Sequence, residues 1–298
     1  MTAHQYLESV LEANKFDDES TGQTVAERRA EVEEKLRKEF GSKIQTIKYS
    51  GSIAKATAVK DSYDVDIAVH FKHDAFDKLK EMFDAVYDFL KKHYTVRKQR
   101  VSVGIKSLHV DVVPGRRINA DDPQDNDVNL YRTDTDSRIK TNIVKQIDAV
   151  SASSVRDVIK LTKIWRDVWG LSFKSFALEL LVMKALDGFD GSGLDNKMKT
   201  VLTFIQENVE NVILSDPGNP SNNVADTIDS GDKEYFKKTA TKCLGFLEDA
   251  EQDEDPDMEN AWRKVFKDQT VNESGSSAGS RIIVMTQDKR VHVDRTHG

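Results

Sequence analysis

The chain has 298 residues, with 44 Lys and Arg against 51 Asp and Glu, and a formal net charge of −7. This length allows two lobes, and an apolar fraction of 38% is enough to build a buried core. The acidic balance argues against a protein whose main task is to coat nucleic acid. Because Cys243 is the only cysteine, an internal disulfide is excluded and a Cys-rich zinc site is disfavoured.

The sequence carries no sign of a membrane or export segment. The first 30 residues lack a basic start followed by an apolar run, so no signal peptide is expected. No stretch of 18 apolar residues occurs, which excludes a transmembrane helix. We therefore expect a soluble, cytoplasmic protein.

The first half of the chain predicts a mixture of helices and strands. A capping box from Thr24 to Glu27 opens a helix that ends at Gly41. In the strand predicted over 64–71, the apolar and polar residues alternate, so Asp64 and Asp66 share one face. The strands are expected over 44–49, 64–71, 94–105 and 107–113, and further helices over 1–20, over 53–58 and from Asp74 onward.

The second half predicts helices almost throughout. They are expected over 153–169, 174–189, 197–213, 232–250 and 259–267. Strands in the first half and helices in the second indicate an α+β protein. We expect a catalytic lobe over residues 1–150, a helical lobe over 151–270, and a flexible Gly- and Ser-rich tail over 271–298.

Three carboxylates are candidates for metal binding. Asp64 and Asp66 share a strand face, and Asp111 lies in a second strand-like run, HVDVVP. Carboxylates held close together repel one another unless cations lie between them. Oxygen ligands of this kind suit Mg²⁺, and two such ions can clamp an in-line phosphoryl displacement. The alternative interpretation is that Asp64 and Asp66 are merely solvated.

A Gly-Ser pair precedes these carboxylates. Gly51 allows a close approach of the backbone to a phosphate, and Ser52 adds a hydroxyl at a predicted helix start, where free N–H groups favour anions. Alone the pair carries little information. Between two strands and ahead of Asp-x-Asp, it favours phosphate binding.

The stretch GSIAKATAVKDSYDVDIAV resembles the Gly-Ser and Asp-x-Asp signature of the DNA polymerase beta-like nucleotidyltransferases. Within them the chain is similar to oligoadenylate synthase, cyclic GMP-AMP synthase and the bacterial cyclic-oligonucleotide synthases of anti-phage signalling. HVDVVPG resembles the family's third-Asp strand, IKLTKIWRDVWGLSFKSFALELLVMKAL its pair of triphosphate-binding helices, and VILSDPGNPSNNVA its segment near the base. The resemblance implies a mixed-sheet catalytic lobe packed on a C-terminal helical lobe, with the active site in the cleft between them.

The resemblance also implies residue roles. Asp64 and Asp66 would ligate two Mg²⁺ ions, with Mn²⁺ as an alternative, and Asp111 would ligate the catalytic ion. Gly51 and Ser52 would hold the donor's phosphates. Lys163 would neutralise the triphosphate as a mobile charge, and Ser175 would bond to a phosphate.

Each of the later positions has a second interpretation. Lys163 could be a solvated helix residue and Ser175 only an N-cap. Asn222 and Asn223 are candidates for contact with the base, or they simply form a turn. The basic stretch 91–100 could contact nucleic acid or an acidic partner, but such a run is more typical of a solvated helix end and strand edge.

The expected function is synthesis of a cyclic di- or trinucleotide second messenger from NTPs, with ATP among the substrates. The alternatives are a template-independent enzyme that makes linear oligoadenylate or extends tRNA, and an inactive nucleotide-binding scaffold. No zinc-finger spacing is present, which argues against an obligatory long DNA duplex as activator. The tail ending in Gly298 is a candidate attachment point for a regulatory or conjugating protein, or a frayed terminus.

Overall fold

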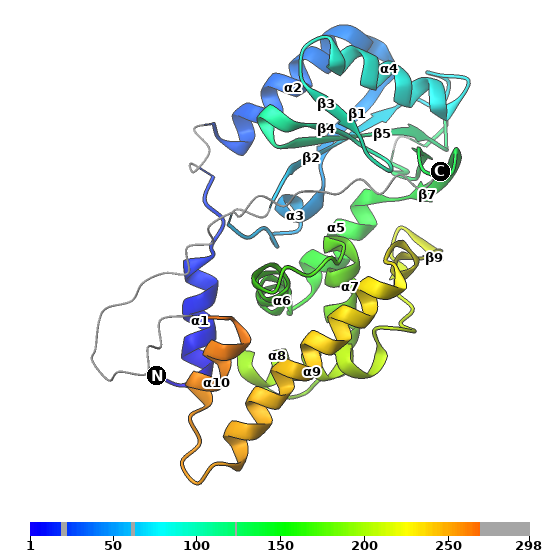
Figure 1. The fold of residues 1–298 in the computed structure, drawn as a ribbon. Helices are drawn as coiled ribbons and strands as arrows, with labels where there is room; N and C mark the ends of the chain where they lie inside the picture. Colours follow the sequence, from blue (N-terminus) through cyan, green and yellow to red (C-terminus); the bar gives the residue numbers. More distant parts are fainter. Residues whose placement is uncertain (19–22, 61–62, 123, 269–298) are drawn as a thin grey trace.

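The computed structural model describes residues 1–18, 23–60, 63–122 and 124–268. It contains a lobe built on a β-sheet and a lobe built from helices (Figure 1). The expected α+β class is therefore confirmed. Residues 271–298, the expected tail, lie outside the described residues.

A mixed sheet forms the centre of the first lobe. Its strands run in the order β1-β2-β5-β4-β3, with β6 paired to β5 and β7 paired to β6. β2 and β5 are parallel, and the remaining neighbours are antiparallel. The strands are β1 (Ile44–Tyr49), β2 (Val65–Phe71), β3 (Val96–Lys98), β4 (Val103–Ile105), β5 (Val110–Arg117), β6 (Val128–Arg132) and β7 (Ser137–Thr141).

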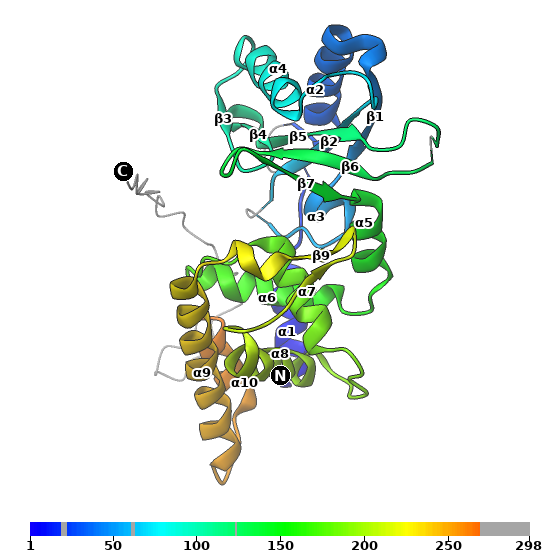
Figure 2. The same ribbon diagram turned by 90° about the vertical axis from the view of Figure 1, so that its right-hand side faces the viewer.

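Two helices, α2 (Val25–Phe40) and α4 (Leu79–Lys91), cover the outer face of this sheet (Figures 1 and 2). The capping box is confirmed, because the Thr24 hydroxyl accepts from the Glu27 N–H and the Glu27 carboxylate accepts from the Thr24 N–H. The alternation in β2 is also confirmed, since its odd-numbered residues pack in the core with these helices. Asp66 alternates with the core residues Val65 and Ile67, so it lies on the inner face of the sheet. This face is turned toward the helical lobe (Figures 1 and 2).

Three local predictions in this lobe are wrong. The short helix α3 covers Gly51–Ala54 instead of 53–58, so it begins at the glycine itself. Residues 94–105 form two short strands with a turn between them. β5 continues through Pro114, which lies after the last residue paired with β4 and before the first paired with β6, so its missing N–H removes no ladder bond on that side.

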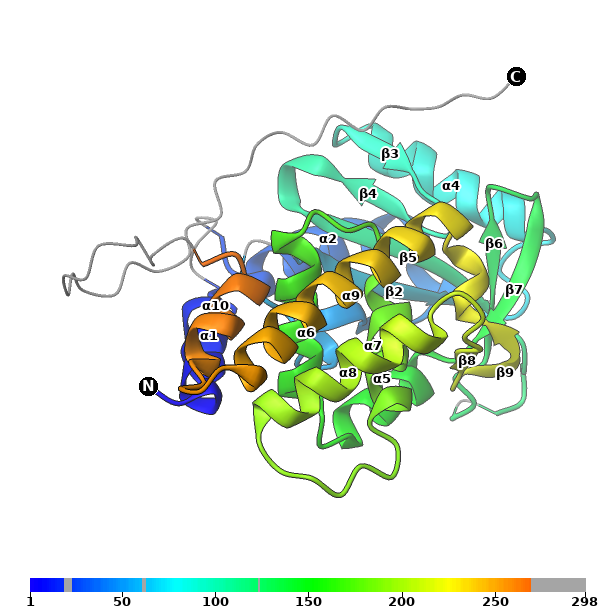
Figure 3. The ribbon, with the colours of Figure 1, turned by 60° about the horizontal axis from the view of Figure 1, so that its bottom comes forward.

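The second lobe is a helical bundle, which the long helix α9 crosses (Figure 3). Short strands β8 (Ser215–Asp216) and β9 (Asn219–Asn223) form a hairpin at its edge. The helices are α1 (Ala3–Ala13), α5 (Ile143–Ala152), α6 (Arg156–Val168), α7 (Ser175–Ala185), α8 (Leu194–Asn208), α9 (Ser230–Gln252) and α10 (Met258–Val265). Within the described ranges, no helix combines the length and the apolar character needed to cross a membrane.

The two apolar cores do not follow a single boundary along the chain, because residues of α1 and Val59 belong to the core of the helical lobe. Tyr6, Leu7 and Val10 of α1 are buried in the core of the helical lobe. These residues form one apolar stripe at helical spacing, and they pack with residues of α10 and α6, far away in the sequence. The N-terminal helix therefore belongs to the helical core, although residues 25–131 supply the core of the sheet lobe.

Candidate active site

The predicted carboxylates gather at the centre of the sheet's inner face. Asp66 of β2 and Asp111 of β5 are direct partners in the parallel register, and Asp64 immediately precedes β2. Their apolar neighbours in both strands point into the outer core, so the two aspartates share the opposite face. The Asp64 carboxylate lies 4.0 Å from Nδ1 of His109. We call Asp64, Asp66 and Asp111 the carboxylate row.

The carboxylate row is electrostatically unfavourable as it stands. Burial, reinforced by the charges of Asp111 and Asp64, raises the pKa of Asp66 to about 7, against the opposing influence of Lys55. Burial and the charge of Asp64 likewise raise the pKa of Asp111 to about 6. A cation placed among these groups would remove that repulsion.

The donor chemistry of the row fits Mg²⁺. Carboxylate oxygens are its preferred protein ligands, and Mg²⁺ usually completes its shell with waters and substrate phosphates. Within the described part of the chain, no three acidic, histidine or cysteine side chains converge into a complete ligand cluster. The row therefore offers part of a coordination shell, which suits an ion that is shared with a nucleotide.

Gly51 packs directly against this row. It has a φ of +65°, and a Cβ atom at this position would lie 1.7 Å from Oδ2 of Asp66. The neighbouring Ser50 N–H donates to the backbone oxygen of Asp66 at 2.9 Å. Only glycine allows this approach, so the structure brings the Gly51-Ser52 pair and the carboxylate row together as the sequence predicts.

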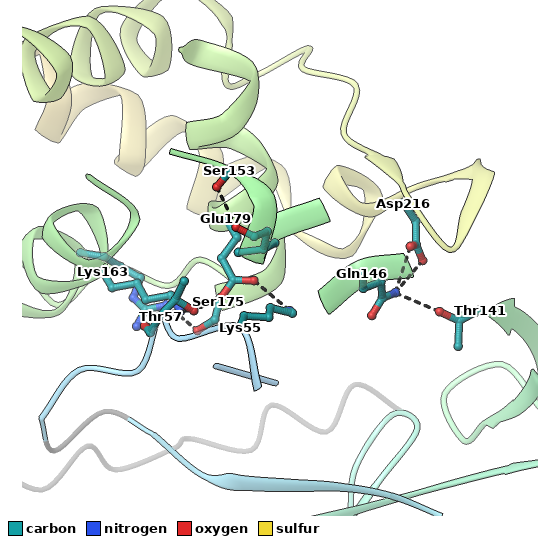
Figure 4. Close-up of polar contacts among 11 residues, drawn as sticks. Lys55, Thr57, Thr141, Gln146, Ser153, Lys163, Ser175, Glu179 and Asp216 are labelled. Carbon is teal, nitrogen blue, oxygen red and sulfur yellow. Dashed lines mark hydrogen bonds and ion pairs between the residues drawn. The ribbon is translucent and has the colours of Figure 1, made fainter. Parts of the chain in front are cut away.

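A second group of ionisable side chains lies where the loop after α3 meets α6 and α7 (Figure 4). Glu179 Oε2 accepts from Lys55 Nζ at 2.8 Å, and Oε1 accepts from Lys163 Nζ at 2.7 Å and from the Thr57 hydroxyl at 2.8 Å. Lys163 Nζ also donates to the Thr57 hydroxyl and backbone oxygen. We call Lys55, Thr57, Lys163 and Glu179 the buried charge cluster.

The buried charge cluster holds Lys163 in place. Its side chain is 2% exposed and is committed to Glu179 and Thr57, so in this structure it is neither a solvated residue nor a mobile charge. Burial would raise the pKa of Glu179, but the ammonium groups of Lys55 and Lys163 lower it to about 2. Burial lowers the pKa of Lys163, and Glu179 opposes this effect. One carboxylate thus serves two ammonium groups.

Glu179 is a residue that the sequence analysis missed. The available signal was a single acidic residue inside the apolar run FALELLVM of α7. A buried carboxylate requires partners, and these come from residues 16 and 124 positions away along the chain.

Ser175 is the first residue of α7 and is exposed. Its Oγ accepts from Nη1 of Arg166 at 3.0 Å. The N-cap of α7 is Lys174, which makes no side-chain capping bond, so the interpretation of Ser175 as an N-cap is wrong. Contact with a phosphate stays a prediction.

Asn222 and Asn223 belong to the β8–β9 hairpin. Asn223 Oδ1 accepts from the Leu214 N–H at 2.8 Å, and Asn222 Nδ2 approaches Asp216 at 3.5 Å. Asp216 is buried and accepts two bonds from Gln146 of α5, which ties the hairpin to the helical lobe (Figure 4). These contacts favour the turn interpretation, and base contact stays a prediction.

One residue of the basic stretch 91–100, Gln99, contacts the carboxylate row. Lys98 and Arg100 are paired with Asp84 and Asp134. Gln99 Nε2, in contrast, donates to Oδ1 of Asp111 at 3.0 Å. The sequence contained no signal for this contact, because it depends on the order of the strands in the sheet.

Comparisons with known proteins agree with this geometry. Residues 1–119 match the family model described as "Second Messenger Oligonucleotide or Dinucleotide Synthetase domain". The cyclic AMP-AMP-AMP synthase of Escherichia coli (strain MS 115-1) is 28% identical, over 59% of this chain and 67% of that protein.

Solved structures show the same fold. E. coli MS115-1 CdnC with ATP is similar with a TM-score of 0.70 and 22% identity, over 88% of this chain and 97% of that one. CdnC in its HORMA-deltaN complex gives 0.71 and 22%, over 89% and 97%. The Elizabethkingia meningoseptica CdnE cyclic dinucleotide synthase with GTP and Apcpp gives 0.60 and 17%, over 83% and 99%.

Proposed function

We propose that this chain, a nucleotidyltransferase, belongs to the bacterial cyclic-oligonucleotide synthase (CD-NTase) family and joins NTPs into a cyclic di- or trinucleotide second messenger. The observation that carries the proposal is the carboxylate row, in which Asp66 and Asp111 are in register and Asp66 packs against Gly51. ATP is the substrate that we propose first, because the curated relative is named for an all-adenine product and the CdnC structure was solved with ATP.

The reaction is a nucleotidyl transfer at phosphorus. A ribose hydroxyl of one nucleotide attacks the α-phosphorus of a second, a new P–O bond forms, and the bond to the bridging oxygen breaks to release pyrophosphate. The protein contributes positioning and charge stabilisation. Closing the ring repeats the same step within a linear intermediate.

The residue roles follow from where the groups lie. Asp64, Asp66 and Asp111 would hold two divalent ions, which when bound would neutralise charge that develops on the reacting oxygens. Asp111 would also orient the attacking hydroxyl, and the Gly51-Ser52 backbone would hold the donor's phosphates beside Asp66.

The buried charge cluster would stabilise the same phosphates indirectly, through the loop that holds them. Lys55 and Thr57 follow the Gly51-Ser52 loop directly, so their bonds to Glu179 fix that loop on the helical lobe. The cluster carries two ammonium groups on one carboxylate, and this excess positive charge favours a triphosphate at the loop. Lys163 would add its positive charge near the triphosphate from its buried position. Ser175 would offer its exposed hydroxyl to a phosphate.

A regulatory partner is part of the proposal. A related structure contains CdnC bound to HORMA-deltaN, so a protein of regulatory type is the partner we propose, in a bacterial anti-phage response. Attachment of another molecule at the C-terminal residues 290–298 stays a separate proposal. Deleting them should weaken capture of that molecule without changing synthesis by the purified protein.

Product analysis tests the proposed function. The full chain is incubated with four radiolabelled NTPs and Mg²⁺, and the products are treated with phosphatase and linkage-specific nucleases. A phosphatase-resistant product supports a cyclic synthase, whereas a ladder of linear products would identify a template-independent polymerase. NTP binding without any pyrophosphate release would identify a scaffold.

Matched variants show that the activity belongs to this site. Asp66→Asn and Asp111→Asn should lose the product. Asp88→Asn removes an exposed carboxylate from α4 in the same lobe and should retain it.

A further inference from the structure

A straight row of residues crosses four strands of the sheet at the level of the carboxylates. Asp66 of β2 pairs with Asp111 of β5, Asp111 pairs with Gly104 of β4, and Gly104 pairs with Arg97 of β3. Directly paired residues point to the same face, so all four positions belong to the inner face. At about 4.8 Å per strand, Arg97 lies roughly 14 Å from Asp66 across the sheet.

Gly104 is the one member of this line of four residues that has no side chain. A Cβ atom at Gly104 would lie 2.9 Å from Oδ1 of Asp111, 2.8 Å from Nε2 of Gln99 and 3.0 Å from Nε of Arg97. Polar groups of Arg97 in β3, Gln99 in the turn after β3 and Asp111 in β5 therefore converge at this point and leave no room for a side chain. The glycine is required here for space, since its φ is not in the left-handed region.

Two hydrogen bonds fix the Asp111 carboxylate from this side. The Ser102 hydroxyl donates to Oε1 of Gln99 at 2.7 Å, and Nε2 of Gln99 donates to Oδ1 of Asp111 at 3.0 Å. The bond from Ser102 sets which end of the Gln99 amide faces Asp111. The turn itself is held by Thr133, whose hydroxyl donates to the Gln99 backbone oxygen at 2.9 Å.

Arg97 and its neighbour Lys98 point to opposite faces. Lys98 is engaged with Asp84 at 2.7 Å and lies over the rings of Phe83 and Tyr87 on the α4 side. Arg97 is exposed on the inner face, beside Asp111. The basic stretch thus contributes one guanidinium to the site, and the adjacent lysine serves the outer core.

The two ends of this line of four residues differ in the ligand groups that they can bind. Gly51 packs against Asp66 at one end, where the proposed function places the phosphates of the donor nucleotide. Arg97 lies at the other end, beyond Asp111, which that function assigns to the attacking hydroxyl. The attacking nucleotide also carries phosphates, and a guanidinium is the side chain best suited to bind them.

We propose that the β3–β4 hairpin forms the subsite for the attacking nucleotide, in which Arg97 binds one of its phosphates and Gln99 positions the Asp111 carboxylate. This inference rests on the proposed function and deepens it. Gly104 allows the Gln99 and Arg97 side chains to approach Asp111 closely.

Equilibrium binding tests the subsite. The probe is ATP with a methylene group in place of the α–β bridging oxygen, titrated with Mg²⁺ into the full chain by calorimetry, because this analogue binds without releasing pyrophosphate. Wild type and Lys98→Ala should bind two equivalents. Arg97→Ala should keep one and bind the other about 10- to 100-fold more weakly, as expected for loss of a charge-assisted bond to phosphate, and Arg97→Lys should recover part of the loss.

Kinetics of pyrophosphate release separate the two residues. Arg97→Ala should raise KM for ATP, whereas Gln99→Ala should lower kcat with little change in KM, because Gln99 acts through Asp111. Thermal unfolding confirms that each variant is folded.

Coincident isotherms for wild type and Arg97→Ala would overturn the inference, as would equal weakening of both sites. If the wild type binds the analogue but makes no pyrophosphate from ATP or from the four-NTP mixture, the proposed function fails instead.

Discussion

The carboxylate row gathers three acidic side chains at the centre of the sheet, whereas the buried charge cluster surrounds one acidic side chain with two ammonium groups and a hydroxyl. In the row, the pKa of Asp66 rises to about 7, and in the cluster the pKa of Glu179 falls to about 2. The row is therefore incomplete without a cation, while the cluster is complete as it stands. We infer that the row is built for a ligand, and that the cluster fixes the Gly51-Ser52 loop and adds positive charge beside the proposed phosphates.

Removing a carboxylate from the row should have the largest effect. Asp66→Asn or Asp111→Asn should lower pyrophosphate release by roughly a thousandfold or more, because metal ligation contributes several kcal/mol to stabilisation of the transition state. In EDTA at pH 8, the same variants should unfold at higher urea concentrations than wild type, since they remove like-charge repulsion. A variant that loses both activity and stability would contradict this assignment, and Asp88→Asn should change neither.

Removing the carboxylate of the cluster should have the opposite effect on stability. Glu179→Gln leaves two buried ammonium groups without their counter-charge, and we expect it to lower the free energy of unfolding by about 3–5 kcal/mol. The matched control is Glu251→Gln, which breaks a half-exposed pair with Lys199 and should cost about 1 kcal/mol or less. Urea unfolding measures both, and equal losses would show that the cluster is not structural.

The contact between the loop and the row can be broken at Gly51. Gly51→Ala should lower pyrophosphate release about a hundredfold, because the new Cβ would displace the Asp66 carboxylate and small misplacements of reacting groups cost about that much. Gly41→Ala is the control, since Gly41 also has a positive φ, of +48°, but has open space around its Cβ. Similar losses in the two variants would mean that backbone strain alone is responsible.

The pH dependence of stability tests the like-charge repulsion within the carboxylate row. The pKa of Asp66 is about 7 in the folded protein and that of Asp111 about 6, both above the ordinary value of 3.8, so the folded state holds these protons more tightly. Without divalent ions, the free energy of unfolding should therefore fall by roughly 4–6 kcal/mol as pH rises from about 4 to about 8. Mg²⁺ should reduce this fall, and Asp66→Asn should flatten it. If the free energy of unfolding depends on pH in the same way in Asp66→Asn and in wild type, the raised pKa of Asp66 is contradicted.

Local sequence patterns were enough to predict the main helices and strands and the side of the site where Gly51 meets Asp66. The alternation of Val65, Ile67 and Val69 placed Asp66 on the inner face, and the Thr24 capping box fixed the start of α2. Gly51 lies only 15 positions before Asp66, and the turn between β1 and α3 brings the two into contact. Such features depend on neighbours in sequence, so the sequence reveals them.

The remaining features depend on contacts between distant segments. Glu179 meets Lys55 only because α7 packs against the loop after α3, and Gln99 meets Asp111 only because β4 lies between β3 and β5. The strands β6 and β7 were not predicted, because VNLYR and SRIKT are too short and polar to show a clear alternation.

Anomalous diffraction from crystals grown with Mn²⁺ and the α,β-methylene ATP analogue tests the central claim most directly, because it locates the ions themselves. The account predicts one or two Mn²⁺ peaks in contact with the carboxylates of Asp66 and Asp111, beside the phosphates held at Gly51 and Ser52. A bound analogue without Mn²⁺ at Asp66 and Asp111, or Mn²⁺ bound only at other carboxylates, would contradict it.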